Sequence, residues 1–86
     1  MNKTIINKQY LKQFIRNYET YYNTLNVVTD DVTCALYLGK ELMFEKACDN
    51  NLIRDDLEAI VEHTWRITHD EDTVISVLQK FNCEVI

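Results

Sequence analysis

Histidines and clustered carboxylates are the residues of this chain whose types could do chemistry. His63 and His69 lie six positions apart, whereas two metal ligands on one helix meet at spacings of three or four residues. Carboxylates gather at residues 55–58 and 70–72, where we expect helices to begin and where a helix dipole stabilises them. An EF-hand calcium loop also needs a glycine and a distal glutamate, which the sequence around 70–72 lacks. These patterns predict no metal site and no cofactor.

Catalytic motifs are missing from the chain. Its 86 residues contain one glycine and no proline, so they cannot build a glycine-rich phosphate loop. No GxSxG sequence is present, and the acidic clusters stand at predicted helix starts rather than facing each other across a cleft. A helical domain of this length also offers little room for a deep pocket. We therefore expect a protein that is not an enzyme.

Acidic and aromatic side chains are instead in surplus. The net charge is −5, and residues 27–86 carry thirteen anions against five cations. The 5 tyrosines exceed what a small core can bury with every hydroxyl hydrogen-bonded, and tyrosine is enriched at protein interfaces. We expect a small factor (an inhibitor, an antitoxin-like or immunity-like protein, or an adaptor) that binds a basic protein surface. The expected partner-binding residues are Asp49, Asp55, Asp56, Glu58, Glu62, Tyr10 and Tyr21.

A basic flank on the first predicted helix supports an alternative function. Lys8, Lys12 and Arg16 are spaced four apart, and residues 1–26 carry four cations against one anion. Two copies joined through the tyrosines would align these cations into one strip, as in a homodimeric transcriptional or nucleic-acid-binding regulator. The acidic remainder of the chain repels phosphate, so nucleic acid is the less favoured partner. The basic flank is also expected to be able to lie near that acidic remainder.

The tyrosines and the basic flank belong to one amphipathic helix predicted over residues 8–25. Its apolar positions fall within an arc of about 140° at 100° per residue. Asn7 precedes the helix as an N-cap, and Ile6 and Leu11 stand at the two positions of a hydrophobic staple. A stripe this rich in aromatic residues must bury against the protein's own core or against a partner.

A second helix is predicted from the start signal at residues 29–31 to Ala47. Apolar residues cover three of its sides, which predicts the central and most buried helix of the fold. Gly39 in its main stripe would let a neighbouring helix approach closely. The alternative is an α+β fold with a β-hairpin at residues 32–47 that turns at Gly39 and Lys40. The strong helix formers of residues 41–47 favour the helix.

Two further helices are predicted after a polar turn at residues 48–51. The apolar residues of the third run from Ile53 to Ile67 in an arc of about 160°. Thr68 and Glu71 match a capping box that opens the fourth helix, whose narrower apolar face ends at Phe81. The apolar tail at residues 83–86 either makes a last contact or frays. Together these elements predict an all-α, small four-helix bundle, with residues 1–86 as a single helical domain.

The composition indicates what kind of protein this is and where in the cell we expect it. With 47% hydrophobic residues the chain can form one core, but no stretch approaches the roughly 20 apolar residues that cross a bilayer. Three widely spaced cysteines and a start unlike a signal peptide indicate reduced thiols, so we expect a cytoplasmic protein with no membrane partner. Richness in Asn, Ile, Lys, Thr and Tyr is typical of AT-rich coding DNA, which is common in phages and mobile elements.

Overall fold

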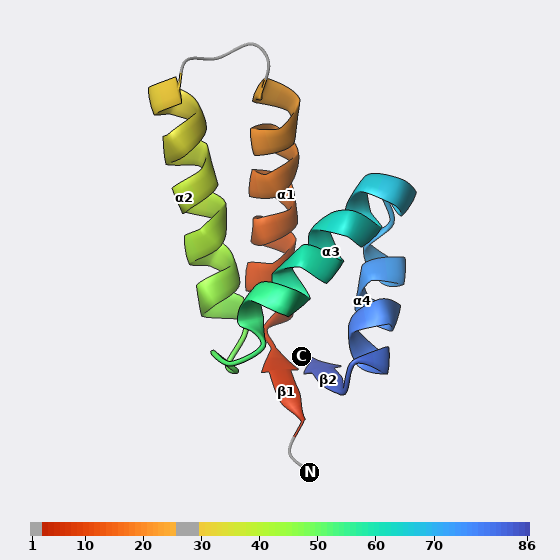
Figure 1. Ribbon diagram of the computed structural model, residues 1–86. Coiled ribbons are helices and arrows are strands. Elements are labelled where there is room, and N and C mark those ends of the chain that lie inside the picture. The colour runs from red at the N-terminus through yellow and green to blue at the C-terminus, as the bar shows by residue number, and fades with distance from the viewer. Residues whose placement is uncertain (1–2, 26–29) are drawn as a thin grey trace.

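A computed structural model of the protein describes residues 3–25 and 30–86 (Figure 1). Within them, four helices confirm the prediction of a small four-helix bundle, to which two short strands are added. The elements are β1 (Thr4–Ile6), α1 (Lys8–Thr24), α2 (Asp30–Ala47), α3 (Arg54–Thr68), α4 (Glu71–Lys80) and β2 (Cys83–Val85). α1 and α2 lie side by side as a hairpin of helices, and α3 runs obliquely toward α4 (Figure 1). The predicted start signal at Thr29 and the turn before it lie outside the described residues.

α1 begins where the sequence indicates. The Asn7 side-chain oxygen accepts a hydrogen bond from the Tyr10 backbone N–H at 3.1 Å, which satisfies one of the unpaired donors of the first helical turn. Ile6 and Leu11, the two staple residues, are fully buried. The predicted N-cap is therefore confirmed. The apolar arc of the helix supplies much of the core, through Leu11, Phe14, Ile15 and Tyr18.

α2 corrects three predictions. The helix continues through Gly39 and Lys40, so the alternative hairpin at residues 32–47 is wrong. α2 is also not the central helix, because Leu38 and Leu42 are 61% and 48% exposed and only one side of α2 packs against α1 (Figure 1). Gly39 faces open space instead of a closely approaching helix. The strong helix formers of this segment correctly predict a helix. Its many apolar residues predict a buried helix, and that prediction is wrong.

The junction between α3 and α4 corrects the predicted capping box. Thr68 is the last residue of α3, and its hydroxyl donates to the Thr64 carbonyl oxygen at 2.8 Å. His69 adopts a left-handed backbone with φ of 48°, which ends α3. Asp70, not Thr68, is the residue that precedes α4. The predicted start of α4 is therefore wrong by two residues.

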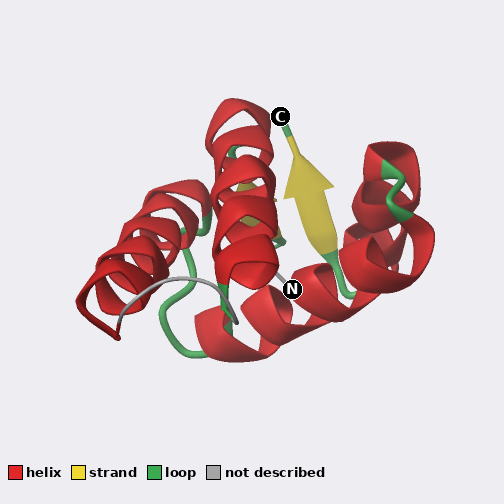
Figure 2. Ribbon diagram, turned by 90° about the horizontal axis from the view of Figure 1, so that it is seen from above, coloured by secondary structure: helices red, strands yellow, loops and turns green. Residues whose placement is uncertain are grey.

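A two-stranded parallel sheet joins the two ends of the described chain. Thr4 pairs with Cys83 and Ile6 with Val85, while Ile6 also forms a bridge to Cys48. The tail at residues 83–86 therefore packs instead of fraying. Figure 2 shows β2 beside α1, with helices on both sides. The sheet was not predicted, because each strand has only three residues and its partner lies at the far end of the chain.

The core lies where the helices meet. The Phe14 ring packs edge-on against the Phe44 ring with centroids 4.9 Å apart, which joins α1 to α2. The largest fully buried side chains are Phe14, Phe44, Ile6, Leu11, Leu78, Val61 and Val74. Among the described residues, no helix has both the length and the hydropathy to cross a membrane.

Candidate functional site

The core contains one buried lysine. Lys40 is only 2% exposed and reaches inward from α2. Its Nζ lies 2.7 Å from Glu62 Oε2, 2.9 Å from Glu58 Oε2 and 3.3 Å from Glu41 Oε1. Lys40 Nζ donates hydrogen bonds to Glu58 and Glu41, whereas its contact with Glu62 is an ion pair, so three carboxylates balance the charge of the buried cation.

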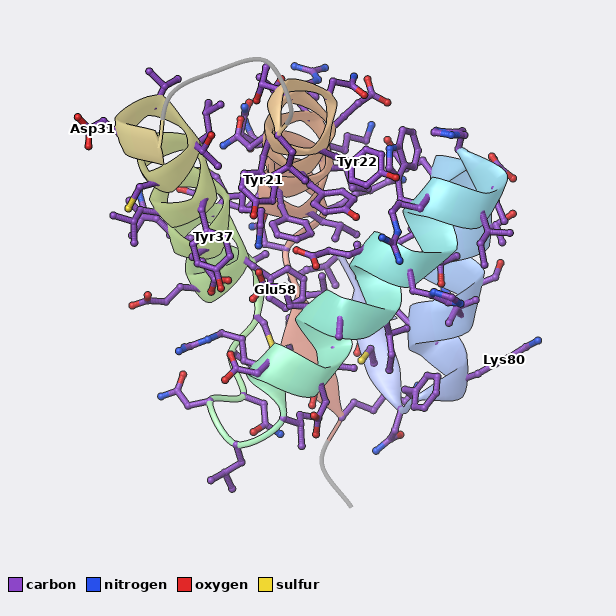
Figure 3. All side chains as sticks on the ribbon, turned by 45° about the horizontal axis from the view of Figure 1, so that its top comes forward. Tyr21, Tyr22, Asp31, Tyr37, Glu58 and Lys80 are labelled. Atoms are coloured by element: carbon purple, nitrogen blue, oxygen red, sulfur yellow. The ribbon has the colours of Figure 1, made fainter. Side chains whose placement is uncertain are left out.

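Aromatic rings form the other wall around this cation. Lys40 Nζ lies 4.3 Å from the Tyr37 ring centroid, 5.7 Å from that of Tyr21 and 5.8 Å from that of Phe14. The faces of such rings attract a cation, more strongly where water is excluded. Figure 3 shows Tyr21, Tyr37 and Glu58 directed toward the same space between α1, α2 and α3. The cluster therefore connects α1, α2 and α3 through contacts with the Lys40 ammonium.

Outside Lys40 the same side chains line an open cleft of about 290 Å³. We call it the acidic cleft, and its lining residues are Tyr37, Lys40, Glu41, Asp55, Glu58, Ala59 and Glu62. Asp55, Glu58 and Glu62 follow at spacings of three and four, so α3 presents them on one face. Four carboxylates and one ammonium line this cleft, so it carries an excess of negative charge.

This crowding shifts the ionisation of the cluster. The pKa of Glu58 is raised to about 7, chiefly by burial and also by the nearby Glu41 carboxyl, against the lowering effect of Lys40. Burial alone would lower the pKa of Lys40, but hydrogen bonds and attraction to Glu62 and Glu58 outweigh it and raise that pKa. Burial would raise the pKa of Glu41, but hydrogen bonds with Glu58 and Lys40 lower it. The cation is thus retained, while one carboxyl of the cluster titrates near neutral pH.

The free energy of unfolding is expected to fall by about 2–3 kcal/mol as the pH rises from about 5 to about 8. The native carboxyl of Glu58 holds its proton up to about pH 7, whereas in the unfolded chain it titrates near 4.5. Its contribution is therefore fully present below the lower value and lost as the pH passes the higher one. Lys40 stays charged throughout this range, and the lowered pKa of Glu41 places its own effect at more acidic pH. Urea titrations at a series of pH values measure the change.

Glu58→Gln is the control for this pH dependence. Gln cannot ionise, so the variant should be markedly less sensitive to pH than the unchanged protein over the same range. Tyr37, Asp55 and Glu62 also face the cluster and are kept in both proteins. Equal slopes in the two proteins would show that Glu58 is not the titrating group.

The acidic cleft also contains the donor atoms of a cation site. Glu41, Asp55 and Glu58 each bring a carboxylate oxygen within 4.8 Å of the other two. Hard cations such as calcium prefer oxygen ligands but take six to eight of them. Glu58 and Glu41 already bond to the Lys40 ammonium, so few of these carboxylate oxygens are free to serve as metal ligands. The expected absence of a metal and of a cofactor stays a prediction.

A second cavity, of about 490 Å³, lies between the C-terminal halves of α1 and α3. Tyr18, Tyr22 and Trp65 supply aromatic walls, and Arg66 lies over the Tyr22 ring at 5.7 Å. Burial raises the pKa of Tyr18. Among the described residues, the buried indole N–H of Trp65 has no hydrogen-bond partner. The cavity is more apolar and less charged than the acidic cleft.

The acidic cleft brings together three of the predicted partner-binding residues. Asp55 is exposed at its rim, whereas Glu58 and Glu62 are paired with Lys40. Tyr21 lies behind the cleft, with its ring 5.6 Å from that of Tyr37. The prediction thus named three residues that share this face of α3, but it did not include the lysine that they surround.

The other predicted partner-binding residues lie elsewhere. Asp49 accepts a hydrogen bond from the Ile5 backbone N–H at 2.9 Å and so supports the strand region. Asp56 is exposed on α3. Tyr10 is 40% exposed at the start of α1, where Lys46 Nζ lies 5.9 Å from its ring.

The basic flank of α1 is exposed at Lys8, Lys12 and Arg16. Lys12 Nζ lies 3.6 Å from Glu71 Oε1 at the start of α4. The predicted approach of the basic flank to the acidic remainder is confirmed at this pair. Because Glu71 offsets part of the charge, the flank is a weaker site for phosphate than the sequence alone indicates.

Lys40 is the residue that sequence reasoning missed. In helical projection Lys40 falls between Leu36 and Phe44, on the side of α2 that faces the core. A lysine on that side needs an anionic partner, and the Glu58 and Glu62 pair at i and i+4 was available to provide one. The sequence contains this signal, but the prediction assigned Lys40 a position only in the alternative turn with Gly39.

Comparisons of the chain with protein-family models, with curated proteins and with solved structures gave no match.

Proposed function

We propose that this protein is a non-enzymatic factor that binds a basic surface of another protein through the acidic cleft. One observation supports this most strongly: four carboxylates line an open cleft that holds a single ammonium. A lysine or arginine side chain of a partner would reduce the repulsion among these carboxylates. Asp55 and Glu41 are the most accessible of the four to such a side chain.

Binding accounts for the geometry better than catalysis does. A carboxyl that titrates near neutral pH suits general acid–base chemistry, but the Glu58 side chain is only 7% exposed. Its oxygen bonds to Lys40, so proton exchange with a substrate would first break a buried ion pair. The surplus of charge at the rim, in contrast, faces solvent and can steer a basic partner from a distance.

Charge reversal at the rim tests the proposal. Asp55→Lys with Asp56→Lys reverses the charge of one rim residue and of its exposed neighbour on α3, and it avoids the buried Glu58, whose reversal would also unfold the protein. We expect the association rate with a protein captured from native lysate to fall at least tenfold at low salt, because electrostatic steering is lost. Surface plasmon resonance at low and high salt gives the rate and its salt dependence.

The matched control is Asp72→Lys with Glu84→Lys. Both residues are exposed, and Asp72 stands in the first turn of α4 as Asp55 and Asp56 stand in that of α3. The control makes the same change in net charge outside the acidic cleft. Equal association rates for the two double variants would contradict the proposal.

A further inference from the structure

We propose that the partner's contact element is a basic amphipathic helix that lies along the outer face of α2. This inference rests on the proposed function and adds to it the form of the partner. Ala35, Leu38 and Leu42 are exposed and repeat at spacings of three and four. We call these three residues the α2 stripe.

The α2 stripe is a continuous ridge rather than a scatter of apolar residues. At 100° per residue its members fall within an arc of about 60°, directed away from the buried side of the helix at Phe44 and Ala47. In Figure 1, α2 stands at the edge of the fold, with α1 on one side only. An exposed apolar row of this kind commonly marks an interaction surface, and a helix fits it by laying its own row alongside.

The acidic residues beside the α2 stripe indicate that the partner's helix is basic. Glu41 and Glu45 follow one margin of the stripe, and Asp31 lies in line with it near the start of α2. Glu41 also lines the acidic cleft, so the acidic margin continues into that cleft without a break. A helix with lysines or arginines along one side of an apolar face matches both features.

The same charges disfavour two other occupants. A second copy of this chain carries the same net charge of −5 and would bring its own acidic margin against the first. An anionic membrane surface would be repelled by Asp31, Glu41 and Glu45. Lys46, the cation nearest the opposite margin, lies by the Tyr10 ring.

Two fluorescein-labelled peptides of equal charge separate the stripe from the acidic cleft. One is a 15-residue leucine–lysine peptide with leucines spaced to form one helical face, and the other has serine in place of every leucine. We expect fluorescence anisotropy to show at least tenfold tighter binding of the leucine–lysine peptide. Leu38→Ser with Leu42→Ser should remove that preference, whereas the control Leu52→Ser with Ile67→Ser, at exposed residues elsewhere, should keep it.

Cys34 gives a second readout that does not depend on affinity alone. Its thiol is exposed on the outer side of α2, whereas Cys48 and Cys83 are buried. Saturating leucine–lysine peptide is expected to slow the reaction of Cys34 with a maleimide at least threefold. An unchanged reaction rate at saturation would overturn the placement on α2.

The outcomes distinguish failure of this inference from failure of the proposed function. The serine–lysine peptide reports the acidic cleft, and its loss of binding in Asp55→Lys with Asp56→Lys supports the proposed function by itself. A leucine preference that survives Leu38→Ser with Leu42→Ser would overturn only the inference. A dimer in light scattering that these serines convert to a monomer would also overturn it, since a second copy would then occupy the stripe.

Discussion

Replacing Lys40 with methionine is expected to lower the free energy of unfolding by about 3–5 kcal/mol at pH 7.5. Methionine keeps much of the length of the side chain but removes the charge. Glu58 and Glu62 would then lie side by side, one buried and the other partly so, without the ammonium that lies 2.9 and 2.7 Å from their oxygens. A domain of this size has about 5–15 kcal/mol in total, so the variant should be close to unfolding.

The loss should depend on pH in a way that simple loss of packing would not. At pH 5 Glu58 carries its proton, because burial raises its pKa to about 7, and the uncompensated charge is smaller. Urea denaturation of Lys40→Met should therefore show a milder defect at pH 5 than at pH 7.5. Adding Glu58→Gln to Lys40→Met should recover part of the stability, because one of the two carboxylates is gone.

Lys80→Met is the matched control for this prediction. Lys80 is exposed in the last turn of α4, and Figure 3 shows its side chain extending away from the fold. Its loss removes a favourable interaction with the helix dipole, worth about 0.3–1 kcal/mol. Equal losses of stability for the two lysine variants would contradict the structural role of Lys40.

The sequence predicts the helices of this fold because each carries a local signal. Asn7 caps α1, and the residues at 41–47 are strong helix formers that prevail over the turn suggested by Gly39. The strands carried no such signal. Ile6 and Val85 pair across almost the whole chain, and short strands are specified by contacts that only the folded protein brings together.

The candidate site was predicted in part, for a related reason. Asp55, Glu58 and Glu62 share a face of α3 by spacing alone, so their proximity followed from the helix. That α3 turns this face toward Lys40 depends on how α2 and α3 pack, which local patterns do not determine. The prediction that α2 is the most buried helix is wrong for the same reason, because local patterns do not show which side of a helix is covered. Leu38 and Leu42 were expected in the core but face solvent.

Truncation of Phe14 to alanine is the second large expected effect, at about 3–5 kcal/mol of unfolding free energy. Phe14 is fully buried, and its ring contacts Phe44 edge-on at 4.9 Å while Lys40 Nζ lies 5.8 Å away. The substitution leaves a cavity between α1 and α2 and removes one aromatic wall from the buried cation. Closing the cavity would require a shift of α1 or α2, and a shift of α2 would move Lys40 relative to Glu58 and Glu62 on α3.

Phe81→Ala separates this effect from the general loss of an aromatic residue. Phe81 follows α4 and is 52% exposed, so its truncation should cost clearly less, on the order of 1 kcal/mol. A double-mutant cycle between Phe14→Ala and Lys40→Met adds the decisive comparison. We expect the two losses to be less than additive by at least about 0.5 kcal/mol, because each variant disrupts the same cluster. Strict additivity would show that the ring and the ammonium act independently, and the cation–π contact would then contribute nothing to the stability of the cluster.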